Sequence, residues 1–561
     1  MNNKKIFIST LIGTLLSTLS MLVDSYFTMI HKALTTGSQF EHNGFTHPIM
    51  DILIGVAAGV IFYYFGEAIL DKFNINLNLD DGFTLYPSLS APSLDKKRAM
   101  HPKPDKRLLI DEIDGKSFIF GKYKDKYVGI KLDSHDIRNI TLIGAPGVGK
   151  SVSLITNLIA FQQNNTAVTF GFDVKPELAS KSNYIDASNV RYVDPTSMIG
   201  CGWNVYYELG EDPSTAEIDK IINTLDTISR ALIQQESKDN LIFSESARNI
   251  FIGACAYGIR RKRGFIDCLT AILQTPLQDL IAEIMLDKDI DPEIKSYVNA
   301  YQNDNETTQS INVTLRQSLN LFQNKNVFYK LQNCLVMASP LDLLNDINVY
   351  IAIPDYELKE YSPILRLIAT QVMNELGKTS DIERSKPGTK PIILLLDEFG
   401  SIGKIPNIFD ALARFRSRQI MVITAYQCLH QVALTYSKEE ANMLWDLSKV
   451  KLVLSNTDDE TANKISNLAG KYRESKTSLS TRGEMIFKDK SNTYSEEYRP
   501  ILEGNDLLTI EDKKEIVVFT KEGYNRVKRA DYFLIDGLKE WSEDCKKHNE
   551  KLIEAQTGEQ R

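Results

Sequence analysis

The sequence predicts an α/β protein with two additions: an all-α segment inserted into the α/β domain, and a two-helix transmembrane hairpin at the N-terminus. Short apolar runs alternate with helix-like stretches over most of the chain, as in a mostly parallel sheet with helices on both faces. Residues 215–331 show helical periodicity with almost no strand pattern. Two uncharged, mainly apolar runs lie close to the N-terminus.

Length and composition narrow the class of protein. The 561 residues leave room for about two to four domains. The 43% hydrophobic and 25% charged residues are ordinary for a folded chain. A net charge of −8 excludes a globally basic nucleic-acid-binding protein, so any contact with nucleic acid has to be local. The 6 cysteines are scattered without a Cys-x-x-Cys pair, which argues against a metal site or a disulfide framework and favours reduced cysteines in the cytoplasm.

The first segment, residues 1–71, is predicted to cross a membrane twice. Its spans are residues 6–23 and about 48–70. The first span has 18 residues and the uncharged centre of the second, residues 52–66, has 15, whereas a spanning helix needs roughly 17 to 25 residues. A cleaved signal peptide fits less well, because the first run lacks a small-x-small cleavage site and a second apolar run follows it. Lys4 and Lys5 precede the first span, so the positive-inside preference places both termini and the body of the chain in the cytoplasm.

A linker and a divided α/β domain follow. Residues 72–107 contain several prolines and no sustained periodicity, and they are predicted to be an extended linker. The α/β domain occupies residues 108–214 and 332–536, on either side of the all-α segment, and it opens with a predicted hairpin at residues 118–132. The predicted core strands are residues 140–143, 168–174, 190–193, 347–353, 392–396, 420–424 and 450–454. The predicted helices include residues 363–376, 405–416, 439–447 and 460–468.

One loop carries a complete phosphate-binding pattern. It lies between the predicted strand 140–143 and a predicted helix at residues 151–161, where free backbone N–H groups and the helix dipole favour an anion. Its glycines let the backbone curl around phosphates, Lys150 would reach the β- and γ-phosphates, and the hydroxyl of Ser151 would ligate Mg²⁺. The residues of this loop are Gly144, Ala145, Pro146, Gly147, Val148, Gly149, Lys150 and Ser151.

An acidic pair far downstream complements this loop. Asp397 and Glu398 directly follow the apolar run 392–396. Acidic residues at strand ends are common, but downstream of a phosphate loop Asp397 would hold Mg²⁺ and Glu398 would polarise an attacking water. Ligands bind at the carboxyl ends of parallel strands, so both motifs are expected at one edge of the sheet. Together they predict a nucleoside-triphosphate hydrolase.

Two charged segments remain. Arg260, Arg261, Lys262 and Arg263 form the densest basic run, inside the all-α segment. This run is either a solvated turn before Gly264 or a local contact for a nucleic acid. Residues 537–561 are predicted to be a short charged tail.

The motifs follow one another in an order that resembles one protein family. After the phosphate loop come residues 172–178 (Phe-Asp-Val-Lys-Pro-Glu-Leu), 203–205 (Trp-Asn-Val), 394–400 (Leu-Leu-Leu-Asp-Glu-Phe-Gly), 402–406 (Ile-Gly-Lys-Ile-Pro), 426–427 (Tyr-Gln), 456–462 (Asn-Thr-Asp-Asp-Glu-Thr-Ala) and 498–502 (Tyr-Arg-Pro-Ile-Leu). Over roughly residues 1–535, the chain resembles the type IV secretion system coupling proteins, the TraG/TraD-like ATPases of conjugative DNA transfer. It departs from the family pattern at Pro176, where the family has a glycine, and at Val205, where it has a proline.

The resemblance implies a RecA-like nucleotide-binding domain in a homohexamer, with a central channel and nucleotide sites between subunits. Gln427 matches the glutamine that senses the γ-phosphate. Arg416 is the best match to an arginine finger that reaches the neighbouring subunit's site, since charge on the transferring phosphoryl group calls for a guanidinium. Arg414 and Arg418 are alternatives for that role, and a solvated helix end is the other interpretation of Arg416.

The resemblance also implies cofactors, partners and a location. ATP and Mg²⁺ would drive the transfer of single-stranded DNA bound to a relaxase, or of protein effectors, to a type IV secretion channel at the bacterial inner membrane, with the hairpin in the lipid bilayer. Two other classes remain as alternatives. A septal or chromosome-segregation DNA translocase would usually carry a C-terminal winged helix, for which residues 537–561 are too short. The intact Lys150, Ser151, Asp397 and Glu398 argue against a catalytically inactive membrane scaffold.

Overall fold

The computed structural model describes residues 75–77, 85–87, 99–132, 138–234, 241–455, 458–482, 489–508, 510 and 512–558. The two predicted transmembrane spans, residues 6–23 and 48–70, lie outside the described residues. Within the described part of the chain, no helix combines the length and the apolar character that crossing a bilayer requires.

The chain divides into two compact units, Met1–Pro92 and Ser93–Arg561. In the first unit, β1 (Ile75–Leu77) pairs antiparallel with β2 (Leu85–Pro87). The second unit contains the α/β domain, the helical segment and the C-terminal residues.

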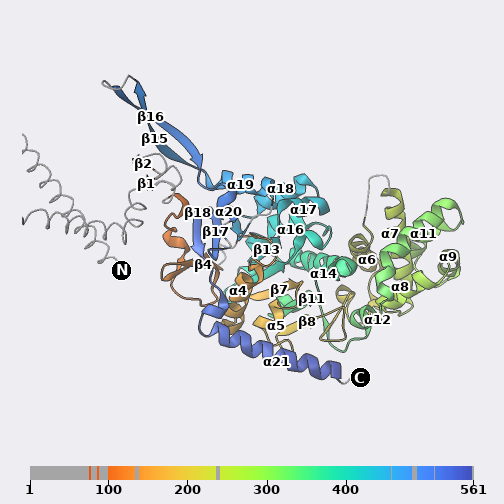
Figure 1. The fold of residues 1–561 in the computed structure, drawn as a ribbon. Coiled ribbons are helices and arrows are strands. Elements are labelled where there is room, and N and C mark those ends of the chain that lie inside the picture. The colour runs from red at the N-terminus through yellow and green to blue at the C-terminus, as the bar shows by residue number, and fades with distance from the viewer. Residues whose placement is uncertain are drawn as a thin grey trace, which may run out of the picture. The chain divides into compact units, whose positions relative to one another are not determined.

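The second unit is built around a mixed sheet (Figure 1). Its parallel strands are β6 (Ile140–Ile143), β7 (Val168–Asp173), β8 (Val190–Val193), β11 (Asn348–Ala352), β12 (Ile392–Leu396), β13 (Ile420–Tyr426) and β14 (Val450–Val453). Its antiparallel strands are β3 (Leu109–Ile110), β4 (Ser117–Tyr123), β5 (Lys126–Lys131), β17 (Glu515–Thr520) and β18 (Gly523–Lys528). Among the described residues, twelve strands follow the order β3-β5-β4-β18-β17-β14-β6-β13-β12-β7-β11-β8. A separate hairpin joins β15 (Lys471–Arg482) to β16 (Asp489–Pro500).

The predicted core strands are confirmed, with small shifts at their ends. β6, β8 and β12 have the predicted limits. β13 extends to Tyr426, beyond the predicted end at residue 424, because Ala425 and Tyr426 continue the pairing with Leu142 and Ile143 of β6. β4 and β5 form the predicted hairpin.

The sheet is buried on both faces. Along β12, Ile392 and Leu394 belong to one apolar core, while Ile393 and Leu395 belong to a second core, as the alternation of side chains across a strand requires. The second core includes residues of α4 (Lys150–Asn164) and α5 (Leu178–Ser182). The first core includes residues of α14 (Leu358–Lys378), α16 (Ile408–Arg414), α17 (Leu429–Thr435), α18 (Lys438–Leu447) and α19 (Asp459–Ala469).

Two predicted helices differ in extent from those observed. α14 begins about a turn before the predicted start at Pro363, and the proline lies inside the helix, where it removes one backbone hydrogen bond without ending the helix. α16 is shorter than predicted, since Asn407 adopts a left-handed conformation (φ 59°) before it and residues after Arg414 continue as a 3₁₀ helix, η9 (Phe415–Arg418).

A helical segment connects β9 (Gly202–Trp203) to β10 (Met337–Ala338), two short strands that pair in parallel. Its helices are α6 (Ile218–Leu232), α7 (Leu241–Arg260), α8 (Phe265–Gln274), α9 (Leu277–Leu286), α10 (Pro292–Val298), α11 (Glu306–Leu319) and α12 (Lys325–Phe328). Figure 1 shows this group together, with α7 in contact with α6, α8, α10 and α11. The pairing of β9 with β10 brings the entry and the exit of the segment side by side, as an insertion requires.

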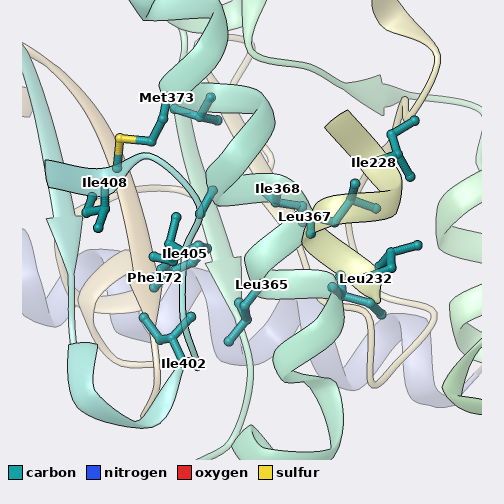
Figure 2. Close-up of a cluster of buried hydrophobic side chains, with 14 of the residues drawn as sticks. Phe172, Ile228, Leu232, Leu365, Leu367, Ile368, Met373, Ile402, Ile405 and Ile408 are labelled. Atoms are coloured by element: carbon teal, nitrogen blue, oxygen red, sulfur yellow. The ribbon is translucent and has the colours of Figure 1, made fainter. Parts of the chain in front are cut away.

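One continuous core joins the helical segment to the sheet. Figure 2 shows α14 between α6 and the sheet, with buried side chains from all three. The labelled residues are Phe172, Ile228, Leu232, Leu365, Leu367, Ile368, Met373, Ile402, Ile405 and Ile408, each at most 3% exposed. Full burial of such a side chain contributes about 1.5–3 kcal/mol, so α6 is held firmly against the domain that carries both nucleotide motifs.

The residues predicted only as a charged tail form helix α21 (Leu538–Gly558). Figure 1 shows it alongside α5. Its indole Trp541 Nε1 donates to the carbonyl of Ser182 over 2.9 Å, and the buried Asn549 Nδ2 donates to the carbonyl of Asn183 over 2.8 Å. Leu538, Trp541, Cys545 and Asn549 recur at helical spacing, which a count of charges alone does not detect.

Candidate nucleotide site

The phosphate loop begins where β6 ends and leads into α4. Gly147 and Gly149 adopt left-handed conformations, with φ of 85° and 97°, which glycine allows at little cost. Gly149 precedes α4, and among the described residues no side-chain hydrogen bond caps the start of this helix. The first backbone N–H groups of α4 are therefore open to an anion.

The strand order brings the predicted residues to one edge of the sheet. β13 lies between β6 and β12, and β7 lies on the far side of β12. The phosphate loop, Gln427 and the acidic pair each follow the carboxyl end of a strand in this parallel group. Asp173 ends β7 beside Asp397, since Phe172 pairs with Leu396.

Two of the predicted catalytic residues are in direct contact. Lys150 Nζ donates to the carbonyl of Gly144 over 2.8 Å and lies 3.5 Å from Glu398 Oε1. Glu398 has a left-handed backbone (φ 48°), uncommon for a residue with a side chain, and its N–H donates to Asp397 Oδ1 over 3.1 Å. The sharp turn directs both carboxylates toward the phosphate loop: Asp397, Glu398, Lys150 and Ser151 line one cavity of about 140 Å³.

Burial perturbs two carboxyl groups in this region. Asp397 is 5% exposed, and burial raises its pKa to about 7, with the neighbouring charge of Glu398 adding to the rise and Lys150 opposing it. Burial raises the pKa of Asp173 to about 6, although three backbone N–H groups, of Glu177, Leu178 and Ala179, donate to its carboxylate. A carboxyl group with such a raised pKa is partly protonated near neutral pH, and binding of a cation would displace that proton.

The donor set suits Mg²⁺ held mainly by phosphates and water. Within the described residues, no group of three or more His, Cys, Asp or Glu side chains is placed to hold a metal. Ser151 and Asp397 line the same cavity. Mg²⁺ in nucleotide sites is typically bound by one or two protein oxygens, with phosphates and water completing the shell, so these two residues fit the ion and the nucleotide that brings it.

Gln427 and Arg416 lie near opposite ends of the strand β13. Gln427 directly follows β13 and is half-buried, and its backbone N–H donates to Gln431 Oε1 over 3.0 Å. Arg416 lies in η9, just before the amino end of β13, and therefore at the opposite edge of the sheet from its own nucleotide site. Arg416 is exposed and makes no hydrogen bond or ion pair with the described residues.

The two alternatives to Arg416 are engaged within the chain. Arg418 Nε lies 3.2 Å from Asp381 Oδ1, and its Nη1 donates to the carbonyl of Gly377 over 2.8 Å. The exposed Arg414 donates through Nε to the carbonyl of Asp410 over 3.2 Å. Of the three arginines, Arg416 has the guanidinium with the greatest freedom to reach another chain.

Several residues of the site carried no role in the sequence analysis. Lys175 and Glu177 also line the cavity. Arg529, which follows β18, donates to the carbonyl of Val148 in the phosphate loop and pairs with Asp531 over 3.1 Å. The Lys-x-Glu spacing near the end of β7 was a usable signal, whereas nothing in the sequence connects Arg529 with the loop.

The basic run at 260–263 is neutralised within the helical segment. Arg260 pairs with Asp291 over 2.7 Å, Arg261 with Asp287, Lys262 with Asp212 over 3.6 Å, and Arg263 with Glu283 over 3.2 Å. Arg260 also donates to the carbonyls of Ser214 and Ala216. This pairing favours a structural turn over a free contact for nucleic acid.

Fold and site together define an α/β protein with a phosphate-loop motif at the edge of a largely parallel sheet, and comparison with known proteins specifies the family. The family of type IV secretory system conjugative DNA transfer matches residues 94–558, and the chain belongs to this family.

Curated relatives match over a shorter stretch. The chain is 27% identical over 191 residues to protein VirD4 of Rhizobium rhizogenes and 25% identical over 191 residues to protein VirD4 of Rhizobium radiobacter. Each alignment covers 33% of this chain, but only 27% and 26% of the respective relatives. The chain therefore matches about a quarter of the length of these proteins.

Solved structures share the fold over most of the chain. The bacterial conjugative coupling protein TrwBΔN70 in its unbound form has a TM-score of 0.57 at 14% identity, covering 78% of this chain and 90% of its own. TrwB in complex with the ATP analogue ADPNP has a TM-score of 0.56 at 14% identity, covering 72% and 87%. TrwB in complex with ADP and Mg²⁺ has a TM-score of 0.55 at 15% identity, covering 72% and 88%.

Proposed function

We propose that this protein is an ATP hydrolase that couples a conjugative cargo to a type IV secretion channel. One observation carries the proposal: the phosphate loop and the pair Asp397-Glu398 share one cavity, with Lys150 in contact with Glu398. Membership of the conjugative DNA transfer family supports this function over a septal DNA translocase, and complexes of TrwB with ADPNP and with ADP and Mg²⁺ support ATP and Mg²⁺ as its cofactors.

Each residue of the site has a role in this proposal. The loop from Gly144 to Gly149 and the start of α4 bind the phosphates through backbone N–H groups, and Lys150 offsets their charge. Ser151 and Asp397 hold Mg²⁺, which when bound neutralises charge on the β- and γ-phosphates. Glu398 polarises the attacking water, and Gln427 contacts the γ-phosphate from the strand between the two motifs.

The assembly and the location are part of the same proposal. The chain forms a homohexamer in which Arg416 reaches the neighbouring subunit's nucleotide site, and this arrangement is supported by its exposure at the far edge of the sheet. Residues 1–71 span the bacterial inner membrane twice and the ATPase body is cytoplasmic. The cargo is single-stranded DNA with its relaxase, or protein effectors, that the ring passes to the channel.

We propose domain limits that follow the sequence analysis. Residues 72–107 are the linker, residues 108–214 and 332–536 form the nucleotide-binding domain, and residues 215–331 form the all-α domain. The parallel pair β9 and β10 supports an insertion at this place.

ATP turnover by the purified full-length protein tests this function, beside a mating assay in a strain that lacks the gene. Lys150→Ala should lose both activities, because the phosphates lose their cation. Glu398→Gln should still bind ATP but hydrolyse it about 10²- to 10⁴-fold more slowly, because the water loses its base. Normal turnover by the Glu398→Gln protein would contradict the assigned role.

A further inference from the structure

We propose that Gln431 is a positioning residue that holds the carboxylate of Glu398 and links it to Gln427. This inference rests on the proposed function, because it requires that Glu398 act on the attacking water. Gln431 lies on the short helix α17, is half-buried, and is absent from the cavity-lining residues of the phosphate loop. Its action would therefore pass through Glu398 and not through the nucleotide.

The side-chain amide of Gln431 bridges two predicted catalytic positions. Its Oε1 accepts a hydrogen bond from the backbone N–H of Gln427 over 3.0 Å. Its Nε2 lies 3.4 Å from Glu398 Oε2 and 3.1 Å from Ser401 Oγ. One rigid amide therefore connects the residue after the central strand β13 to the carboxylate after β12.

The hydrogen-bonding groups around it fix the direction of this amide. A backbone N–H only donates, so the oxygen of Gln431 has to face Gln427. An ionised carboxylate only accepts, so the NH₂ group has to face Glu398. Reversing the amide would place two donors together at one end and two acceptors together at the other, which costs about 1–3 kcal/mol for each unsatisfied group.

The backbone around Glu398 is shaped to receive α17. A Cβ added at Gly400 would lie 2.9 Å from Gln431 Cγ and 3.1 Å from its Cδ, so glycine permits the approach. The hydroxyl of Thr435 donates to the carbonyl of Gly400 over 2.5 Å. The ring of Tyr436 stacks on Phe399 at 5.1 Å between centroids. These contacts fix α17 against residues 399–401 independently of the Gln431 amide.

The contact of Glu398 with Lys150 explains why the hydrogen bond from Gln431 is needed. Within the described residues, Lys150 and Gln431 are the side chains within hydrogen-bond distance of the Glu398 carboxylate, one at each oxygen. The phosphates of a nucleotide compete for the ammonium of Lys150, since they carry more negative charge than one carboxylate. When Lys150 turns to the phosphates, Gln431 is the contact that keeps Glu398 from rotating away.

The test measures kcat, KM and the Kd of a fluorescent ATP analogue for full-length variants. Gln431→Leu removes the amide at similar volume, and kcat should fall about 10- to 100-fold, the scale expected when a reacting group is misplaced by about 1 Å. Kd should stay within about twofold, because Gln431 does not line the nucleotide cavity. Gln431→Glu, which keeps the volume and places a second acceptor against Glu398, should lose at least as much kcat and serves as the test if the leucine variant does not fold.

Two controls separate positioning from general structure. Thr435→Val removes the hydroxyl that fixes α17 to Gly400 but leaves the Gln431 amide intact, and it should keep most of kcat. In a Glu398→Gln background, Gln431→Leu should cause a much smaller loss than in the wild-type background, because the carboxylate that it positions is absent and only its contact with Gln427 remains to be lost.

The outcomes distinguish this inference from the function on which it depends. An equal loss of kcat in Thr435→Val and Gln431→Leu, or an additive loss in the double variant, would overturn the positioning role. Wild-type kcat in the Gln431 variants would overturn it as well. Absence of turnover in the wild-type protein would instead count against the proposed ATPase itself.

Discussion

The nucleotide site and the basic turn, formed by Arg260, Arg261, Lys262 and Arg263, both gather charged side chains but hold them differently. At the basic turn each cation has its own carboxylate partner, and the pair of Lys262 with Asp212 is largely exposed. At the nucleotide site Lys150 contacts Glu398 and Lys175 lines the same cavity, whereas the buried acids Asp397 and Asp173 make no ion pair with the described residues and have raised pKa values. Charge density in a sequence marks both places equally, whereas burial and incomplete pairing mark only the site.

Arg416 extends this comparison to an exposed arginine that makes no hydrogen bond or ion pair with the described residues. Its substitution has the largest expected effect on turnover. Arg416→Ala should bind nucleotide normally and lose about 10³- to 10⁵-fold in turnover, the range for a finger that stabilises the transferring phosphoryl group. Arg418→Ala is the matched control from the same 3₁₀ helix, because Arg418 is already engaged with Asp381. Steady-state ATP hydrolysis measures both.

Mixed rings test whether Arg416 acts across subunits. Combining Arg416→Ala with Lys150→Ala protein should restore part of the activity, because some interfaces then contain both intact groups. No rescue in verified mixed hexamers would leave Arg416 as a solvated arginine.

The core strands and the phosphate loop could be predicted from the sequence, because burial and local geometry restrict which residues can form them. The strand at residues 392–396 is wholly apolar because both faces of the sheet are buried, and a strand followed by a glycine-rich loop and a helix permits few structures. Contacts made by residues far apart were not visible. Arg529 reaches the phosphate loop only because β18 and β17 join the sheet beside β14, and the basic turn is neutralised by carboxylates of three different segments.

The ion pair of Arg529 with Asp531 is buried, unlike the exposed pair of Lys262 with Asp212 at the basic turn. Its partner Asp531 is 2% exposed, so Arg529→Met leaves a buried carboxylate without its cation and should lower the free energy of unfolding by about 3–5 kcal/mol. The loss of its bond to Val148 should also weaken nucleotide binding. Chemical denaturation measures the first effect and titration with a fluorescent ATP analogue the second; an unchanged unfolding transition would show that the pair contributes no net stability.

The raised pKa of Asp397 predicts a pH dependence that the basic turn lacks. Below a pKa of about 7 a proton competes with Mg²⁺ for the carboxylate, so affinity for Mg²⁺-ATP should rise by up to about tenfold per pH unit from pH 6 towards 7 and level off above it. The stability of the nucleotide-free protein should change in the opposite direction. The unfolded state releases this proton near pH 4 and the folded state near pH 7, so the free energy of unfolding should fall as pH rises between these values. Asp397→Asn should flatten the Mg²⁺-ATP affinity profile and leave the smaller stability change of Asp173, whose pKa is about 6.

Of these changes, neutralising Lys262 and Arg263 in the basic turn should have the smallest effect on stability and on transfer. Lys262→Gln with Arg263→Gln removes two cations whose pairs with Asp212 and Glu283 are at least a third exposed, and exposed ion pairs contribute about 0–1 kcal/mol. The free energy of unfolding should change little, and single-stranded DNA binding and transfer in the mating assay should be unchanged, because the charge of this turn is already balanced within the helical segment. Arg260→Gln is the informative counterpart, since Arg260 also holds the carbonyls of Ser214 and Ala216 and should cost more stability. A loss of transfer in the Lys262/Arg263 variant at unchanged stability would mean that this turn exchanges its own carboxylates for a cargo phosphate, and would overturn the distinction between a balanced turn and a functional site.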